Sequence, residues 1–208
     1  GEDFDPDLRI AGSDALDFYK LSSFDKNPIR GKAVTLQDEI ELWQVMEREW
    51  KDATPNARVK YLLGNHEIRL RRYIWQKAPE LYSLAGMSFD KVLGLTELGI
   101  EFENFDIETN NTEIVVDNLV IKHGTAARKF SGWSVKAELE KQFFSANVLI
   151  RHCHRAAHIF YTTRRGVIQG AEGFCLCDTN PPYSTGGVMN WQQGIVLATT
   201  DADHVTFE

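Results

Sequence analysis

Apolar runs and amphipathic stretches alternate along the first part of the chain. Residues 8–11 and 59–63 are short apolar runs that predict buried strands. Between them, apolar residues recur at helical spacing up to about residue 53. Thr35 and Asp38 predict the start of this helix, because a threonine side chain can accept a hydrogen bond from the first helical turn. Such an alternation of strand and helix is typical of β-α-β units.

The amphipathic stretch after Thr35 carries an apolar stripe, which we interpret as core packing rather than a binding surface. Its members are Leu36, Ile40, Trp43, Val45, Met46 and Trp50. Further helices are expected over residues 67–76 and from about Pro79. The Asn-Pro and Gly signals at 25–31 predict a loop, and the pattern assigns no element to 87–98.

The second half of the chain is richer in strand signals. Residues 113–122 predict a hairpin that turns at Asp117 and Asn118. A helix is expected over 134–143, followed by a buried strand at 148–150. Further short strands are predicted at 158–161, 167–169, 195–197 and 205–207. The sequence therefore predicts an α/β fold with α+β character, in which helices cover two stacked sheets.

Length and charge narrow the class of protein. The chain has 208 residues, of which 43% are hydrophobic, and this suits one sizeable domain. Its net charge of -7 argues against a broad nucleic-acid footprint. It has no apolar run near the roughly 18 residues of a membrane span and no visible signal peptide. Three cysteines form no disulfide framework, so we expect a cytoplasmic protein.

The most informative motif is Gly-Asn-His-Glu at residues 64–67, between a predicted strand and a predicted helix. Active sites of open α/β sheets lie at the carboxyl ends of strands. The amide oxygen of Asn65 can bind a hard cation, and the imidazole of His66 can serve as an acid or a base. The motif thus suits metal-assisted chemistry on a phosphate.

Four of the six histidines follow apolar runs: His66, His123, His152 and His154. A single histidine at a strand end is usually structural, but four at three strand ends favour a shared site. If residues 152–154 are extended, both of their imidazoles point to one side of the chain. Asp14 and Asn65 would then add oxygen ligands at neighbouring strand ends.

These motifs resemble the calcineurin-like metallophosphoesterases, and most closely their small phage and bacterial members. The family pattern runs Asp-x-His, Gly-Asp-x-x-Asp, Gly-Asn-His-Asp/Glu, His-Gly and Gly-His-x-His. Residues 64–67 match the third motif fully. Residues 123–124 match the fourth, and 152–154 match the core of the fifth. Residues 13–17, Ser-Asp-x-x-Asp, match the second with serine in place of glycine.

The resemblance implies a four-layer α/β/β/α sandwich of two stacked mixed sheets, in a single domain over residues 1–208. It implies a pair of divalent ions, such as manganese, iron, zinc, nickel or magnesium, that clamp a phosphate and acidify a bound water. His66 would assist the leaving oxygen. Asp14 would bridge the two metals, and His154 would belong to the first. The second metal would take Asn65, His123 and His152.

The first family motif is absent, since no Asp-x-His precedes Asp14. We therefore expect the domain to lack its first strand and to be truncated at the N-terminus, either as a fragment of a longer chain or as a naturally degenerate relative. The first metal would keep at most Asp14 and His154, so the chain would hold two ions, one or none. Ser13 and Arg151 also replace glycines of the family pattern.

Three functions stay open. The first is hydrolysis of phosphomonoesters or phosphodiesters, weak or absent in this chain. The second is a catalytically degenerate domain that binds a phosphate-bearing ligand or a protein partner. The third is a nuclease, for which the acidic charge favours short oligonucleotides over duplex DNA. The expected substrate is a small phosphoester or a short oligonucleotide, without a membrane partner. A missing first strand would expose a sheet edge, so a homodimer is expected.

Several other residues have two interpretations. Arg69 and Arg128 could contact a substrate phosphate, although the arginines at 69, 71 and 72 more simply form a solvated helix face. Asp17 could orient a ligand or cap a helix. Cys153 is expected to be a small buried residue that points away from a metal. We interpret Cys175 and Cys177 as packed residues, and Trp133 and Trp191 as packing rather than base-stacking residues.

Overall fold

A computed structural model describes residues 4–22, 34–102, 112–179 and 189–208. The chain forms two compact units, residues 1–110 and 111–208, and each is described by itself. The described residues contain five α-helices and three sheets. The predicted mixed α/β fold is therefore confirmed. The loop predicted at 25–31 lies outside the described residues.

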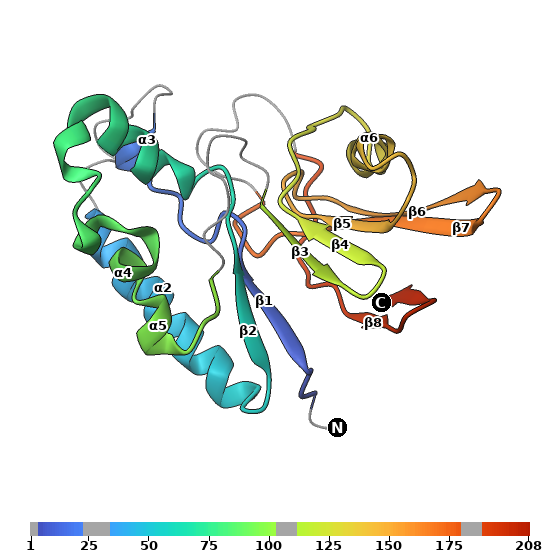
Figure 1. Cartoon of the computed structure of the whole chain (residues 1–208), viewed down its shortest axis with the longest axis horizontal. Coiled ribbons are helices and arrows are strands. Elements are labelled where there is room, and N and C mark those ends of the chain that lie inside the picture. The colour runs from blue at the N-terminus through green and yellow to red at the C-terminus, as the bar shows by residue number, and fades with distance from the viewer. Residues whose placement is uncertain (1–3, 23–33, 103–111, 180–188) are drawn as a thin grey trace. The chain divides into compact units, whose positions relative to one another are not determined.

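The first unit contains a pair of parallel strands, β1 (Leu8–Gly12) and β2 (Arg58–Leu62), as Figure 1 shows. Both strands were predicted. Gly12 is paired with Leu62, so the loops that follow β1 and β2 both begin at the same end of the strand pair. This register brings the segment after Gly12 beside the Gly-Asn-His-Glu motif.

The long helix of this unit, α2 (Leu36–Ala53), begins where the sequence predicts. The Thr35 hydroxyl accepts a hydrogen bond from the Asp38 backbone at 3.0 Å, and the Asp38 carboxylate accepts one from the Thr35 backbone at 2.8 Å. This reciprocal capping box satisfies two backbone N–H groups that a helix start leaves without intrahelical partners.

The interpretation of the apolar stripe of α2 as core packing holds for only part of the stripe. Ile40 and Trp43 are buried, but Val45 and Met46 are 47% and 44% exposed. Glu47 is buried instead, because its carboxylate accepts a hydrogen bond from the Arg9 guanidinium of β1 at 2.7 Å. Ile40, Trp43 and Glu47 lie three or four positions apart, so they share the buried face of the helix, and the ion pair allows a charged residue on that face.

Short helices complete the first unit around β2. The predicted helix after the motif is α3 (Ile68–Lys77). The others are 3-10 helices η1 (Tyr19–Leu21), η2 (Pro79–Leu81) and η3 (Ala85–Met87), and α-helices α4 (Phe89–Leu93) and α5 (Leu95–Leu98). The core includes Leu16, Phe18, Trp43, Tyr61, Phe89, Leu93 and Leu95. Tyr61 lies at its centre, with edge contacts to the rings of Trp43 and Phe89.

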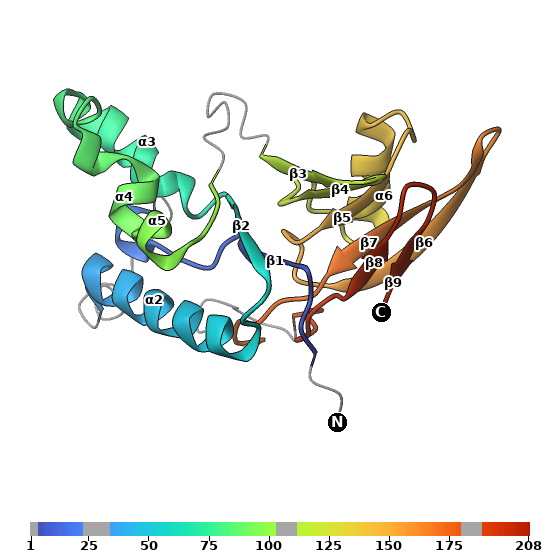
Figure 2. The ribbon, with the colours of Figure 1, turned by 60° about the horizontal axis from the view of Figure 1, so that its bottom comes forward.

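The second unit is built on a mixed five-stranded sheet in the order β3-β4-β5-β7-β6, seen in Figure 2. Its strands are β3 (Glu113–Val116), β4 (Leu119–Lys122), β5 (Asn147–Ile150), β6 (Ala156–Thr163) and β7 (Gly166–Gly173). The pairs β4–β5 and β5–β7 are parallel, whereas β3–β4 and β6–β7 are antiparallel. The three parallel strands therefore end on one edge of the sheet.

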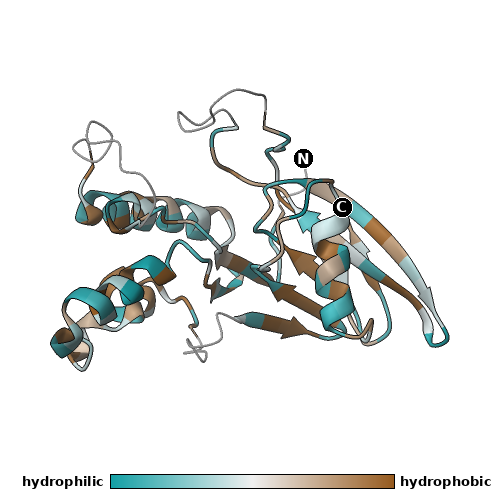
Figure 3. Cartoon of the chain, turned by 90° about the horizontal axis from the view of Figure 1, so that it is seen from above, coloured by the Kyte–Doolittle hydropathy of each residue, from teal (hydrophilic) through white to brown (hydrophobic). Residues whose placement is uncertain are grey.

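One helix, α6 (Trp133–Lys141), packs on this sheet. Val135 and Leu139 are fully buried against Val148 and Ile150 of β5. Figure 3 shows the hydrophobic stretches on the strands and the mixed colouring of the helices, as expected where one helix face meets a sheet.

A small antiparallel pair near the C-terminus is formed by β8 (Ala198–Thr200) and β9 (Val205–Phe207). The strand predicted at 205–207 is confirmed. The one predicted at 195–197 is wrong, because the strand begins three residues later. None of the helices in the described part of the chain combines the length and the apolar character that a bilayer crossing requires.

Candidate metal-binding sites

In the first unit, two loops are interlocked by the carboxylate of Glu67, which is completely buried. It accepts hydrogen bonds from the backbone N–H groups of Gly64 and Ala15, both at 2.8 Å, and of Asp14 at 3.1 Å. The Tyr61 hydroxyl donates another at 3.2 Å. Burial, and next the charge of Asp14, raise the pKa of Glu67 to about 7, although the N–H donors favour its ionised form. Glu67 thus holds the loop after β1 against the loop after β2.

This arrangement leaves no room for a side chain at Gly64. A Cβ atom there would overlap the backbone nitrogen and Oδ1 of Asp14 and lie 2.7 Å from Glu67 Oε2. The glycine of the motif is therefore required for close approach of the two loops rather than for a left-handed backbone.

The turn that carries Asp14 is strained. Gly12, Ser13 and Asp14 have φ of 85°, 65° and 67°, so three successive residues are left-handed. Each residue other than glycine costs about 1–2 kcal/mol in this region. The Ser13 N–H donates to the Leu62 carbonyl at 2.6 Å, which holds the turn in place. Serine and aspartate are thus accommodated in this turn at a cost.

His66 lies between two carboxylates of this turn. Its backbone N–H donates to Asp14 Oδ1 at 2.9 Å, and its Nε2 lies 3.9 Å from Asp14 Oδ2. Its Nδ1 lies 3.2 Å from Asp17 Oδ1. Burial alone would raise the pKa of Asp17, but His66 and Arg69 outweigh it and lower that pKa. Asp17 is therefore an ionised partner that orients the imidazole.

The contacts between Asp17 and Arg69 decide how these two residues are interpreted. Arg69 Nη1 donates to the Asp17 carbonyl at 2.6 Å and to its carboxylate at 2.7 Å. The Arg69 side chain is 15% exposed, so this residue is not on a solvated helix face. Asp17 caps no helix, because η1 begins at Tyr19 after a left-handed Phe18. Asn65 lies between Gly64 and His66 and is half-buried.

In the second unit, His123 and His152 form a close imidazole pair. They follow the neighbouring parallel strands β4 and β5, as the sequence predicts for residues at strand ends. His123 Nε2 lies 2.8 Å from His152 Nδ1, and the ring centroids are 4.7 Å apart. Two nitrogens bound to one tetrahedral ion at about 2.1 Å would lie roughly 3.4 Å apart. At 2.8 Å the two nitrogens are within hydrogen-bonding distance, and a separation of about 0.6 Å more would let both bind one ion.

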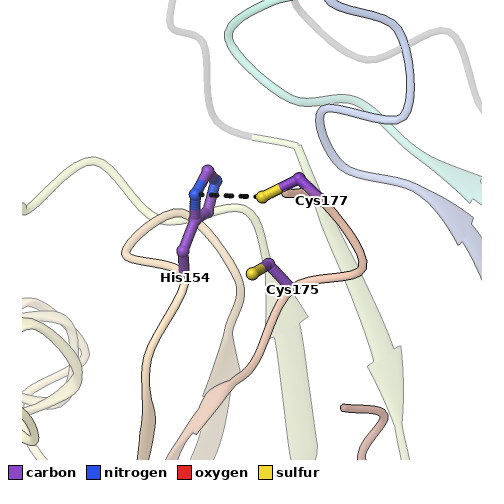
Figure 4. A group of neighbouring side chains, drawn as sticks. All are labelled: His154, Cys175 and Cys177. Carbon is purple, nitrogen blue, oxygen red and sulfur yellow. Dashed lines mark hydrogen bonds between the residues drawn. The ribbon is translucent and has the colours of Figure 1, made fainter. Parts of the chain in front are cut away.

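His154 lies in different surroundings. The extended conformation expected for 152–154 is wrong, because residues 152–153 form a turn and His154 has a φ of 58°. Its ring makes an edge contact with the ring of Trp191, and the two ring centroids are 4.5 Å apart. Its Nδ1 lies 3.8 Å from the Cys177 sulfur, as Figure 4 shows. The structure therefore groups His152 with His123, and His154 with cysteines.

The loop after His123 is held by another buried carboxylate. Glu138 of α6 accepts hydrogen bonds from the backbone N–H groups of Thr125 at 3.0 Å and Ala126 at 3.2 Å. Lys141 donates to it at 2.7 Å, and Lys122 lies 3.4 Å away. Arg128, further along this loop, has a backbone N–H bonded to Ser134 Oγ and a carbonyl bonded to Arg155.

The three cysteines differ in their surroundings. Cys153 is 7% exposed and belongs to the core, as expected. Burial, and next the charge of Glu172, raise the pKa of its thiol to about 12. Cys175 is also buried, but Cys177 is exposed. Cys175 and Cys177 were interpreted as packed residues, and this interpretation is therefore wrong for Cys177. The donor atoms of His154, Cys175 and Cys177 lie within 4.8 Å of one another, so they could hold a metal ion.

The sequence did not predict that the carboxylates of Glu67, Glu138 and Glu172 accept hydrogen bonds from the backbone N–H groups of other segments. Glu67 belonged to the motif, and its position three residues after Gly64 was the available signal. Glu138 and Glu172 sit in ordinary helix and strand patterns, and no local signal marks them. Their partners become visible only when α6 packs on the sheet.

Comparison with known proteins adds no family assignment. No protein-family model matches the chain, and no curated protein matches it either. The resemblance to the metallophosphoesterases therefore rests on the sequence motifs alone.

Proposed function

We propose that this chain is a metal-dependent hydrolase of phosphomonoesters or phosphodiesters, related to the calcineurin-like phosphoesterases. The observation that carries the proposal is the interlocked pair of loops in the first unit, where Glu67 holds Asp14 beside His66. The family resemblance adds a four-layer α/β/β/α sandwich, and this architecture is part of the proposal.

The available donors fit a pair of divalent cations. The proposal gives ligand roles to Asp14 and Asn65 in the first unit and to His123 and His152 in the second. Carboxylate, amide and imidazole donors suit manganese, iron or zinc. Such ions, when bound, polarise the phosphoryl group and lower the pKa of a bound water. The 2.8 Å spacing of the His123 and His152 nitrogens supports a shared ion.

His66 is the proposed acid for the leaving oxygen. The Asp17 carboxylate, 3.2 Å from Nδ1, can accept a hydrogen bond from that nitrogen and orients the ring. Nε2 then carries the proton that the departing oxygen takes up. Arg69 holds Asp17 in place, so Arg69 acts through Asp17 rather than directly on the substrate.

Arg128 keeps its proposed role as a phosphate contact. Its backbone is fixed at both the N–H and the carbonyl, so the side chain leaves the loop after β4 from a defined position. A guanidinium can bind two phosphate oxygens at once. The strained turn at Ser13 and Asp14 supports weak rather than efficient turnover.

The test is hydrolysis of p-nitrophenyl phosphate and bis(p-nitrophenyl) phosphate under excess manganese. We expect slow turnover by the natural chain, and a loss of about 10²- to 10⁴-fold in His66→Gln, which removes the acid. The matched control is His158→Gln on β6, where the imidazole contacts Gln169 at 2.8 Å, away from the proposed ligands in its own unit. This control should retain the natural rate.

Two results would contradict the proposal. One is no turnover above a manganese blank for either ester. The other is turnover that His66→Gln leaves unchanged. If turnover is absent while binding of a phosphate-bearing ligand persists, the chain is instead a catalytically degenerate binding domain.

A further inference from the structure

Three soft or borderline donors meet in the second unit at the end of β7. Cys175 and Cys177 follow this strand, and His154 follows the turn after β5. One imidazole nitrogen of His154 and the two sulfurs lie within 4.8 Å of one another. Figure 4 shows the Cys177 sulfur directed at the imidazole and the Cys175 sulfur on the side that faces the His154 side chain. Residues separated by more than 20 positions thus present three donor atoms to one point.

The backbone holds these donors in place. The Gln192 N–H donates to the His154 carbonyl at 3.0 Å, and the Gln192 carbonyl accepts from the Cys175 N–H at the same distance. One residue therefore clamps both ligand-bearing segments. The Gln193 side chain donates to the Cys177 carbonyl at 2.9 Å, and Trp191 packs on the His154 ring. This frame orients the donors before a ligand binds, which reduces the entropic cost of binding.

The spacing fits a tetrahedral ion. Sulfur and nitrogen ligands at about 2.3 and 2.0 Å from zinc lie roughly 3.5 Å apart in a tetrahedron. The separation of 3.8 Å between His154 Nδ1 and Cys177 Sγ is close to this value. The remaining separations, up to 4.8 Å, require the sulfurs to move inward by about 1 Å, which rotation about the cysteine side chains can supply.

We propose that His154, Cys175 and Cys177 form a zinc site with two thiolates and one imidazole. Thiolates select zinc over manganese and magnesium, which prefer oxygen ligands. Three protein ligands leave the fourth position of a tetrahedral ion open to water or to another ligand. The inference goes beyond the proposed hydrolysis, because it concerns which metal binds at His154 and holds whether or not the chain cleaves phosphoesters.

Cobalt(II) titration of the full chain under a thiol-free phosphine reductant tests this site. Cobalt takes the place of zinc, and a thiolate bound to cobalt absorbs in the near ultraviolet, whereas ligation by histidine alone does not. We expect the band to saturate at one equivalent and to disappear when zinc is added. In Cys177→Ser the band should weaken, and zinc affinity should fall at least about 10-fold, as loss of even a supporting group does at metal sites.

The variants separate ligation from structure. Cys177 is exposed, so Cys177→Ser should keep the natural circular dichroism. Cys175→Ser and His154→Ala should also lower zinc affinity. The matched controls remove the same kinds of group outside the proposed site. Cys153→Ala removes the third thiol, and His158→Gln removes an imidazole on β6. Both should bind zinc as the natural chain does.

The proposal is overturned by the absence of a charge-transfer band in the reduced chain. It is also overturned if the band survives both Cys177→Ser and Cys175→Ser, or if Cys153→Ala abolishes it in a folded chain. The readout is spectroscopic, so it is independent of phosphoester turnover, and the failure of either proposal can be told from failure of the other.

Discussion

At the scale of single residues, the candidate site of the first unit depends on contacts that a sequence motif does not describe. Gly64 allows the loop after β2 to touch the Asp14 turn, and Glu67 ties the two loops together through backbone N–H groups. The motif Gly-Asn-His-Glu therefore has two structural members around two chemical ones. Its glycine and glutamate build the frame that presents Asn65 and His66.

Gly64→Ala is expected to destabilise the protein by about 1–3 kcal/mol, because the new methyl group would overpack the contact with Asp14 and Glu67. Urea denaturation followed by circular dichroism measures the change. Gly86→Ala is the matched control, since a Cβ atom at Gly86 meets nothing within 4 Å. This control should shift stability by less than about 0.5 kcal/mol. Equal effects in both variants would contradict the close-approach argument.

At the scale of elements, two buried carboxylates connect α6 to the sheet. Glu172 of β7 accepts hydrogen bonds from the N–H groups of Ser134 at 3.1 Å and Val135 at 3.2 Å, in the first turn of α6. The N-cap residue, Gly132, has no side chain, so a glutamate from another element caps this helix. Glu138, one turn further along, holds the loop after His123. Helix α6 therefore positions one of the candidate ligands.

Glu138 makes the stability of this element depend on pH. Burial alone would raise its pKa, but Lys141, the Thr125 N–H and Lys122 outweigh burial and lower the pKa to about 2. Since the pKa is lower in the folded state than the ordinary 4.5, the stabilisation is present above about pH 4.5. It is lost as the pH falls toward 2.

Glu138→Gln should therefore reduce the free energy of unfolding at pH 7 by about 1–2 kcal/mol, a value discounted for solvent screening at the half-exposed Lys141. The difference from the natural chain should shrink as the pH approaches 2.5. Denaturant titrations at several pH values measure it. Glu140→Gln, at an exposed position of the same helix, is the control and should have little effect at any pH. A loss that does not vary with pH would refute the electrostatic explanation.

At the scale of the whole molecule, the acidic charge restricts the partners. The net charge of -7 opposes close approach to a polyanion, since duplex DNA binding depends on many lysine and arginine contacts to phosphates. The proposed phosphoesterase activity is compatible with this charge, because a small phosphoester requires only a local cationic centre.

We therefore expect no retardation of a 30-base-pair duplex by low micromolar protein at about 150 mM salt in an electrophoretic mobility assay. Non-specific binders in this salt range have dissociation constants of about 10⁻⁴–10⁻⁶ M, and an acidic chain should bind more weakly. A clear shift that weakens as salt increases would show a basic surface and would favour the nuclease function.

Local sequence patterns determined most of the elements. Thr35 and Asp38 predicted the start of α2 correctly. The apolar runs at 8–11 and 59–63 form the parallel strands β1 and β2. The hairpin at 113–122 turns at Asp117 and Asn118, as predicted. For the helix cap and the hairpin, the signal and its partner lie within a few residues, so their energetics are local and readable from the sequence, whereas β1 and β2 were predicted as elements but pair across the chain.

Only the tertiary structure decided which of the chemically useful residues meet. His152 and His154 are two positions apart, yet one pairs with His123 and the other faces Cys175 and Cys177. The charged Glu47 can lie on the buried face of α2 because Arg9 of β1 pairs with it. These outcomes depend on strand pairing and packing between residues 20 to 40 positions apart. The sequence by itself thus determined the elements and the residues capable of chemistry, and packing determined how those residues are grouped.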